Sequence, residues 1–124
     1  ALRAEDWVAK ADEHTIVLND FVFGTGDTLP EITMHALTLG TPQRDADGRI
    51  VNAVMLLHGT GGDATSLLQP HFGDAMFGPG QPLDITRYYV ISPSNLGHGK
   101  SSKPSDGLRA AFPAAAELEP LWER

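Results

Sequence analysis

Residues Asn52 to Gly62 read NAVMLLHGTGG, and this segment gives the clearest indication of the fold class. Its first six residues form a short, nearly continuous apolar run rather than an alternating one. Such a run is typical of a strand buried on both faces, as in a parallel sheet covered by helices. The glycine-rich segment HGTGG follows, and residues 64–68 then resemble the start of a helix, with Asp63 or Thr65 as its N-cap. The stretch therefore predicts a strand, a glycine loop and a helix in succession.

Upstream of this stretch, two segments have the character of paired strands. Residues Thr15 to Phe23 are rich in β-branched and aromatic side chains and end at a Gly-Thr-Gly-Asp turn. Residues Ile32 to Leu39 alternate, and the side chains expected on the inward face are Ile32, Met34, Ala36 and Leu37. Two such runs with a short turn between them predict an antiparallel hairpin. Residues 41–49 are polar and contain an Asp-Gly pair, so we expect a surface loop there.

Downstream, the pattern predicts a helix, a loop and a second buried strand. Pro70 must limit or restart the helix, because proline is not accommodated inside one without a kink. Residues 71–77 give weak helical spacing, residues 78–82 must form a loop, and Tyr88 to Ser92 form the next apolar strand. The order of elements predicts an α/β sheet with an antiparallel start. Residues Ala110 to Arg124 are expected to form a short terminal helix.

Composition and charge exclude several classes of function. The hydrophobic content of 41% and charged content of 20% are those of a soluble globular protein. A net charge of −7 with nine scattered basic residues argues against a nucleic-acid partner. The longest apolar run, Ala53 to Leu57, is too short to cross a bilayer, so no membrane role is expected. Residues 1–15 lack an apolar signal region, and the localisation is not determined.

Metal and cofactor chemistry also find little support. The chain has no cysteine, which removes disulfides, thiolate catalysis and cysteine-bound zinc. Its five histidines lie in different predicted elements without H-x-x-x-H or H-x-H spacing, so we expect no metal site and no cofactor. Those histidines are His14, His35, His58, His71 and His98. The carboxylate pairs Glu5-Asp6 and Asp12-Glu13 are interpreted as solvated surface.

The chemistry is expected in the loops that follow the two apolar strands. In open α/β sheets, sites lie beyond the carboxyl ends of the strands. Three glycines in HGTGG let a ligand approach main-chain N–H groups, next to the positive end of a helix. This suits an anion or the oxyanion of acyl transfer. A P-loop is disfavoured, because the glycine required upstream of Lys100-Ser101 is Ser94. A tight turn without a ligand carries about equal weight on the motif alone.

Several motifs together resemble a known family. NAVMLLHGTGG resembles the strand and oxyanion loop of α/β-hydrolase-fold enzymes. The segments FGPGQPLD, RYYVISP and GHGKSSKPSDGLRA resemble the homoserine O-acetyltransferase-like branch, as does DFVFGTGDTLPEITMHALTLGTP from Asp20 to Pro42. The resemblance covers residues 15–113 of a single, incomplete domain spanning residues 1–124. Residues 1–14 then form an N-terminal extension, and residues 114–124 form a divergent tail. The expected fold class is α/β: the N-terminal part of an α/β-hydrolase sheet, with an antiparallel hairpin before parallel strands and a crossover helix.

The resemblance implies a serine-dependent acyl-transfer or ester-hydrolysis site acting on a small-molecule acyl substrate. It implies a serine on a G-x-S-x-G elbow after the next strand, with Asp and His further along the chain. Among the residues present, Thr60 would act through its main-chain N–H in the oxyanion hole, and Gly59 and Gly61 would shape the loop. His58 would pack beneath that loop. The segment Gly97-His98-Gly99 would form a turn near the pocket mouth, with His98 as a substrate contact.

The chain departs from the family at the nucleophile. It contains no G-x-S-x-G, and the serines that lack flanking glycines are Ser66, Ser92, Ser94, Ser101, Ser102 and Ser105. Ser101-Ser102 and Ser105-Asp106 are interpreted as loop hydrogen-bonding groups. Since a triad cannot be built from one donor loop, we expect no serine-hydrolase activity from this chain alone. Hydrolase and transferase remain alternatives, because both proceed through an acyl-enzyme.

Three functions stay open at this point. The chain could contribute the oxyanion loop of Thr60 to a complete enzyme whose G-x-S-x-G elbow lies in a further segment or in a second chain. It could be a non-catalytic fragment whose exposed sheet edge is covered by a partner chain or by a homo-oligomer. It could be a small-molecule binding module that has no catalytic machinery.

Overall fold

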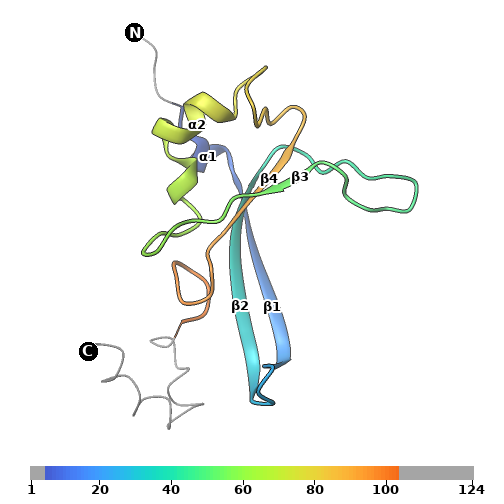
Figure 1. The fold of residues 1–124 in the computed structure, drawn as a ribbon, viewed down its shortest axis with the longest axis vertical. Helices are drawn as coiled ribbons and strands as arrows, with labels where there is room; N and C mark the ends of the chain where they lie inside the picture. Colours follow the sequence, from blue (N-terminus) through green and yellow to red (C-terminus); the bar gives the residue numbers. More distant parts are fainter. Residues whose placement is uncertain (1–4, 104–124) are drawn as a thin grey trace.

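The computed structural model describes residues Glu5 to Lys103, whose sheet has four strands in the order β1-β2-β4-β3. Figure 1 shows α1 and α2 side by side near one end of this sheet, and the long β1–β2 hairpin projecting from the other end. The elements in chain order are α1 (Trp7–Lys10), β1 (Asp12–Val22), β2 (Thr28–Leu39), β3 (Ala53–Met55), the 3₁₀ helix η1 (Ser66–Leu68), α2 (Pro70–Met76) and β4 (Tyr89–Pro93). The expected terminal helix and the Ser105-Asp106 loop lie outside the described residues.

The predicted hairpin is confirmed. Strands β1 and β2 pair antiparallel from Asp12 opposite Thr38 to Val22 opposite Thr28. The turn between them is closed where the Gly26 N–H donates to the Phe23 carbonyl at 2.9 Å. The hairpin forms because β-branched and aromatic residues on both strands favour extended backbone around a glycine-containing turn.

Strand β4 joins the hairpin to the predicted parallel pair. It runs antiparallel to the last part of β2, with Ala36 opposite Pro93 and Leu39 opposite Val90. It runs parallel to β3, with Val54 opposite Val90. The chain passes from β3 to β4 through η1 and α2, so the predicted antiparallel start, parallel strands and crossover helix are all present.

The crossover contains two short helical segments instead of one helix. Asp63 accepts the Thr65 N–H at 2.8 Å through its side chain, whereas Thr65 occupies the N-cap position of η1 without a side-chain capping bond. Pro70 is the first residue of α2 and restarts the helical backbone, as the sequence predicts. Phe77 follows α2 and is fully buried.

The core lies between the sheet and the short helices. Its buried members are Trp7, Leu37, Leu39, Ala64, Leu68, Phe77 and Val90. Trp7, in the segment interpreted as an extension, packs edge-on against Phe77 with ring centroids 5.4 Å apart. Its indole N–H also donates to Asp74 at 2.8 Å. Residues before the hairpin therefore contribute directly to the core that supports the crossover.

The expectation that Asn52 to Leu57 is buried on both faces is wrong for the part of the chain that the structure describes. Met55 is 60% exposed and Leu57 is 61% exposed. Strand β3 is at the edge of the sheet, and β4 is its only neighbour among residues 5–103. Val54 and Leu56 are half-buried, so the helices cover one face and leave the other open. Within the same residues, no helix has the length and apolar character needed to cross a membrane.

Candidate functional site

The glycine loop projects from the carboxyl end of β3. A turn forms where the Gly62 N–H donates to the Gly59 carbonyl at 3.0 Å. Gly61 has φ of +80°, a value that side chains disfavour. The residues at the tip, Gly59, Thr60 and Gly61, are all exposed. Within residues 5–103 the main-chain N–H of Thr60 has no hydrogen-bond partner, so it is available to an acceptor outside this part of the chain.

His58 contacts the start of the glycine loop, where the family resemblance places it. It is buried, and its Nε2 accepts the Asn95 N–H at 3.0 Å. Since that nitrogen accepts, Nδ1 carries the hydrogen and donates to the Gly59 carbonyl at 2.8 Å. His58 thus links the start of the loop to the segment after β4.

The other end of the loop is held at Ala64. The Ala64 N–H donates to the hydroxyl of Ser94 at 3.0 Å, and the Ala64 carbonyl accepts from the hydroxyl of Ser92 at 2.7 Å. All three residues are buried. Both ends of the glycine loop are therefore fixed, whereas its tip is open.

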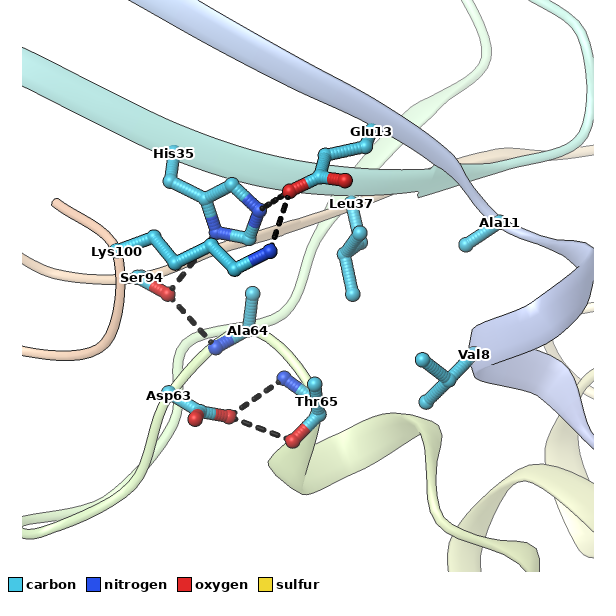
Figure 2. Close-up of a pocket in the computed structure, with 10 residues that line it drawn as sticks. All are labelled: Val8, Ala11, Glu13, His35, Leu37, Asp63, Ala64, Thr65, Ser94 and Lys100. Atoms are coloured by element: carbon cyan, nitrogen blue, oxygen red, sulfur yellow. Dashed lines mark hydrogen bonds and ion pairs between the residues drawn. The ribbon is translucent and has the colours of Figure 1, made fainter.

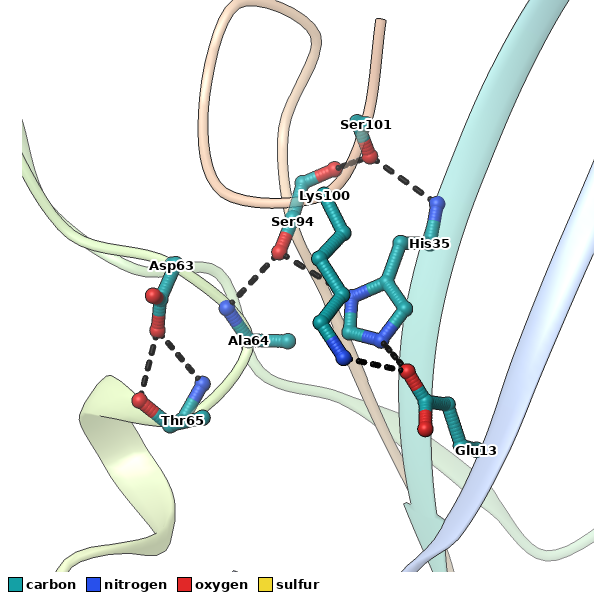
Figure 3. Close-up of polar contacts among 8 residues, drawn as sticks. All are labelled: Glu13, His35, Asp63, Ala64, Thr65, Ser94, Lys100 and Ser101. Atoms are coloured by element: carbon teal, nitrogen blue, oxygen red, sulfur yellow. Dashed lines mark hydrogen bonds and ion pairs between the residues drawn. The ribbon is translucent and has the colours of Figure 1, made fainter.

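A polar chain continues from Ser94 to the hairpin, as Figure 3 shows. Ser94 Oγ lies 3.4 Å from Nδ1 of the buried His35 on β2. His35 Nε2 lies 2.9 Å from Oε1 of Glu13 on β1, and Lys100 Nζ donates to the same oxygen at 2.8 Å. The hydrogen bond from Lys100, followed by that from His35, lowers the pKa of Glu13. Glu13, interpreted from the sequence as solvated surface, is therefore half-exposed but bound to two side chains.

This carboxylate, imidazole and hydroxyl have the order of a catalytic triad without its geometry for catalysis. Ser94 is 1% exposed and already accepts the Ala64 N–H. Gly99 lies so close that a Cβ added there would be 2.6 Å from Ser94 Oγ. The hydroxyl is thus buried and already hydrogen-bonded to the main chain, so we interpret the Glu13, His35 and Ser94 cluster as structural.

A small cavity of about 190 Å³ adjoins the polar chain. Figure 2 shows its apolar side, with Val8, Leu37 and Ala64, facing the polar side with Glu13 and Lys100. Asp63 also lines the cavity, and hydrogen bonds from the Thr65 side chain and N–H lower its pKa. The cavity lies beside the base of the glycine loop and not at the tip that carries Thr60.

The remaining predicted residues occupy separate places. His98 lies in the expected turn and is half-buried, with its ring centroid 5.0 Å from that of His58, so it borders the base of the loop. Ser101 and Ser102 are hydrogen-bonding groups as expected, because their hydroxyls accept the N–H groups of His35 and Thr33. Among residues 5–103, no three histidine or carboxylate side chains are arranged to hold a metal ion.

Sequence reasoning missed the residues that fix the loop. Ser92 and Ser94 are two residues apart at the end of β4, and their hydroxyls face the turn at Ala64. The only available signal was two serines within an otherwise apolar strand end, ISPS. Glu13 and His35 carried no signal, because their contact depends on the hairpin register.

The strand order, the parallel β3–β4 pair and the glycine loop after β3 define the N-terminal part of an α/β-hydrolase fold. Solved structures with this fold support that assignment. The chain superimposes on an acetylester hydrolase from Corynebacterium glutamicum with a TM-score of 0.58 and 20% identity, covering 75% of this chain and 24% of that one. It superimposes on homoserine O-acetyltransferase from Bacillus anthracis with a TM-score of 0.54 and 22% identity, covering 69% and 24%.

Sequence relatives identify the branch. The chain is 35% identical over 88 residues to a probable acyltransferase from Methanothermobacter thermautotrophicus, covering 71% of this chain and 26% of the relative. It is 32% identical over 119 residues to homoserine O-acetyltransferase from Thermus thermophilus, covering 80% and 30%. No protein-family profile matches the chain. The chain is therefore similar to the N-terminal part of the homoserine O-acetyltransferase-like branch of the α/β-hydrolase fold. It spans less than a third of the length of these two relatives.

Proposed function

We propose that this chain is the N-terminal portion of a serine-dependent enzyme that hydrolyses esters or transfers acyl groups, and that it supplies one oxyanion-hole donor. The observation that carries this proposal is the Thr60 N–H. It has no partner within residues 5–103 and lies at the exposed tip of a loop whose two ends are fixed. The names of the relatives, acyltransferase and acetyltransferase, support the reaction class.

The proposed role of Thr60 follows from the charge that develops during acyl transfer. When a serine attacks the acyl carbonyl, negative charge gathers on the carbonyl oxygen, and a fixed N–H stabilises it. A Cβ added at Gly59 or Gly61 would meet nothing within 4 Å, so space is open on both sides of Thr60. The nucleophile and its base must come from another segment or a second chain, because this sequence has no G-x-S-x-G. His98, beside His58 at the base of the loop, is the proposed substrate contact.

The first experiment is the intact mass of the native assembly that contains this chain, under non-denaturing and then denaturing conditions. We expect a larger species, or a second chain, that carries a G-x-S-x-G elbow. A single species of 13.3 kDa would contradict the enzyme proposal. A fluorophosphonate probe should label that assembly and leave the isolated 124-residue chain unlabelled.

The second experiment removes the proposed donor. Thr60→Pro deletes the N–H, and Thr60→Ala keeps it as a matched control. In the active assembly we expect Thr60→Pro to lower kcat by about 10²-fold or more, as for other oxyanion donors. Thr60→Ala should stay close to the parent. Equal activity of the two variants would exclude Thr60 as a donor.

A non-catalytic interaction module is the second candidate, and the open face of β3 favours it. Val51, Met55 and Leu57 are each about 60% exposed, and the outer edge of β3 is unpaired among the described residues. An exposed apolar edge of this kind pairs readily with another chain. A stable complex that lacks any labelled serine would favour this alternative.

A further inference from the structure

The main chain of Ala64 is held by side chains on both its polar groups. Its N–H donates to Ser94 Oγ at 3.0 Å and its carbonyl accepts from Ser92 Oγ at 2.7 Å. The two serines are two residues apart at the end of β4, so both hydroxyls lie on the same face of that strand. Ala64, Ser92 and Ser94 are each at most 2% exposed. Because these groups are buried, water would not readily replace either serine hydroxyl as the hydrogen-bond partner of Ala64.

The direction of the Ser94 hydroxyl follows from its neighbours. The Glu13 carboxylate can only accept, so the 2.9 Å contact requires a hydrogen on His35 Nε2. The other ring nitrogen of a neutral His35 then accepts, and the Ser94 hydroxyl donates to it across 3.4 Å. This leaves the lone pairs of Ser94 Oγ for the Ala64 N–H. Every donor in this series of hydrogen bonds then has an acceptor, and Figure 3 shows the series from Glu13 to Ala64.

The turn connects Ala64 to the tip of the glycine loop. The Asp63 N–H donates to Ser66 Oγ at 3.0 Å, and the Gly62 N–H closes the turn that contains Thr60. A displacement of Ala64 would therefore move the short segment that presents the Thr60 N–H.

We propose that Ser92 and Ser94 are positioning residues that fix Ala64 and thereby the direction of the Thr60 N–H, and that Glu13 and His35 orient the Ser94 hydroxyl. The link to catalysis rests on the proposed function of Thr60. The two hydrogen bonds that hold Ala64, called the Ala64 clamp below, can be tested whether or not Thr60 has that function. The hairpin strand β1 thus contributes to a site that lies beyond the end of β3.

The first test uses the unmodified chain and ¹⁵N NMR of the His35 ring. We expect the neutral tautomer with hydrogen on Nε2, recognised by a protonated-type shift at Nε2 and an unprotonated-type shift at Nδ1. A ring with hydrogen on Nδ1 would overturn the proposed direction, because Nδ1 could not then accept from Ser94.

The second test removes Glu13, the exposed end of the series of hydrogen bonds that runs to Ala64. Glu13→Ala should raise the hydrogen-exchange rate of the Ala64 amide by about fivefold to tenfold, the loss expected when one net hydrogen bond weakens. The amide shifts of Thr60 and Gly61 should change with it. Glu31→Ala is the matched control, since Glu31 is an exposed glutamate on β2 whose side chain makes no hydrogen bond or ion pair among the described residues, and it should change neither.

Ser94→Ala and Ser102→Ala form a second pair at the buried end. Both remove a hydroxyl that accepts a main-chain N–H, but Ser102 Oγ binds Thr33 and not Ala64. Ala64 exchange should accelerate only in Ser94→Ala. Unchanged Ala64 exchange in both Glu13→Ala and Ser94→Ala would overturn the proposal. If the clamp responds but Thr60→Pro keeps full activity, the proposed function fails and the clamp stands.

Discussion

Trp7 meets Phe77 edge to face, with ring centroids 5.4 Å apart and an angle of 77° between the ring planes. The contact joins a residue before the hairpin to the residue that ends the crossover helix. Gly73 makes room for it, because a Cβ there would lie 2.7 Å from Trp7 Nε1. The segment before the hairpin is therefore part of the folded unit.

Phe77→Ala should strongly destabilise the chain. Phe77 is fully buried, and truncating such a ring costs about 3–5 kcal/mol of unfolding free energy. Urea unfolding followed by Trp7 fluorescence, in a Trp122→Phe background, measures the loss. Phe21→Ala is the control, because Phe21 is half-buried on the hairpin, where its ring contacts that of Phe23. Comparable losses in the two variants would contradict the assigned core.

Gly40→Ala should cost far more than Gly48→Ala. Both glycines have φ near +80°, so each substitution carries a similar backbone strain of about 1 kcal/mol. At Gly40 the added Cβ would also collide with the Tyr88 carbonyl and lie 2.8 Å from the Ile85 carbonyl, whereas Gly48 faces open space. We expect a loss of about 3 kcal/mol or more at Gly40. Thermal unfolding measures the loss of stability in each variant. The loss in Gly48→Ala reports the backbone strain, and the additional loss in Gly40→Ala reports the collision.

Asp84 should contribute stability that disappears in acid. Its carboxylate accepts the N–H of Gly80 and both donor groups of Thr86, and these bonds lower its pKa, with the Gly80 bond the largest cause. A pKa lowered by folding adds stability above the ordinary value of 3.8 and loses it as pH falls through the lower folded value. Asp84→Asn should therefore be less stable than the parent at pH 6, with the gap closing below pH 3.8.

Unfolding midpoints measured from pH 6 to below 3.8 check this prediction. Asp47→Asn is the control, since no hydrogen bond to the Asp47 carboxylate is present among the described residues, and its curve should run parallel to the parent. A gap for Asp84→Asn that stays constant with pH would rule out the assigned role of Asp84.

Met55→Glu should weaken association through the open face of β3. Met55 is 60% exposed on an unpaired edge strand, and a charge there disfavours pairing with another chain. Val22→Glu introduces the same charge at a residue 62% exposed at the end of β1. Sedimentation velocity of the chain and of its native assembly should show a smaller species only for Met55→Glu. Equal effects would point to general solubility and away from this face.

Local sequence signals predicted the backbone well. The hairpin, the strand–loop–helix–strand order and the start at Pro70 all follow from propensities and turn residues that act over a few positions. The exposure of Met55 was not predicted, because a continuous apolar run indicates burial but does not say which residues supply it. Strand β3 has one neighbour in the described chain, and that neighbour covers only one edge.

The sequence predicted the glycine loop of the candidate site but not the side chains that hold this loop in place. Glycines and a preceding strand are visible in sequence, so the exposed tip at Thr60 could be anticipated. The bonds from Ser92 and Ser94 to Ala64 depend on the register between two segments about 30 residues apart. The contact of Glu13 with His35 depends on which residues of the hairpin face each other. Such pairings arise from tertiary structure and leave no pattern in a single sequence.

The strand order has a consequence for the order in which the chain folds during synthesis. Strand β3 leaves the ribosome before β4, yet β4 separates it from the hairpin, so β3 has no place in the sheet until residues 89–93 emerge. The hairpin has no such delay, because β1 and β2 are adjacent in both sequence and space. Nascent chains from which residues up to a point between 60 and 85 have emerged from the ribosome should therefore hold a formed hairpin and an unpaired, chaperone-accessible β3. The glycine loop acquires its geometry only when β4 completes the sheet behind it.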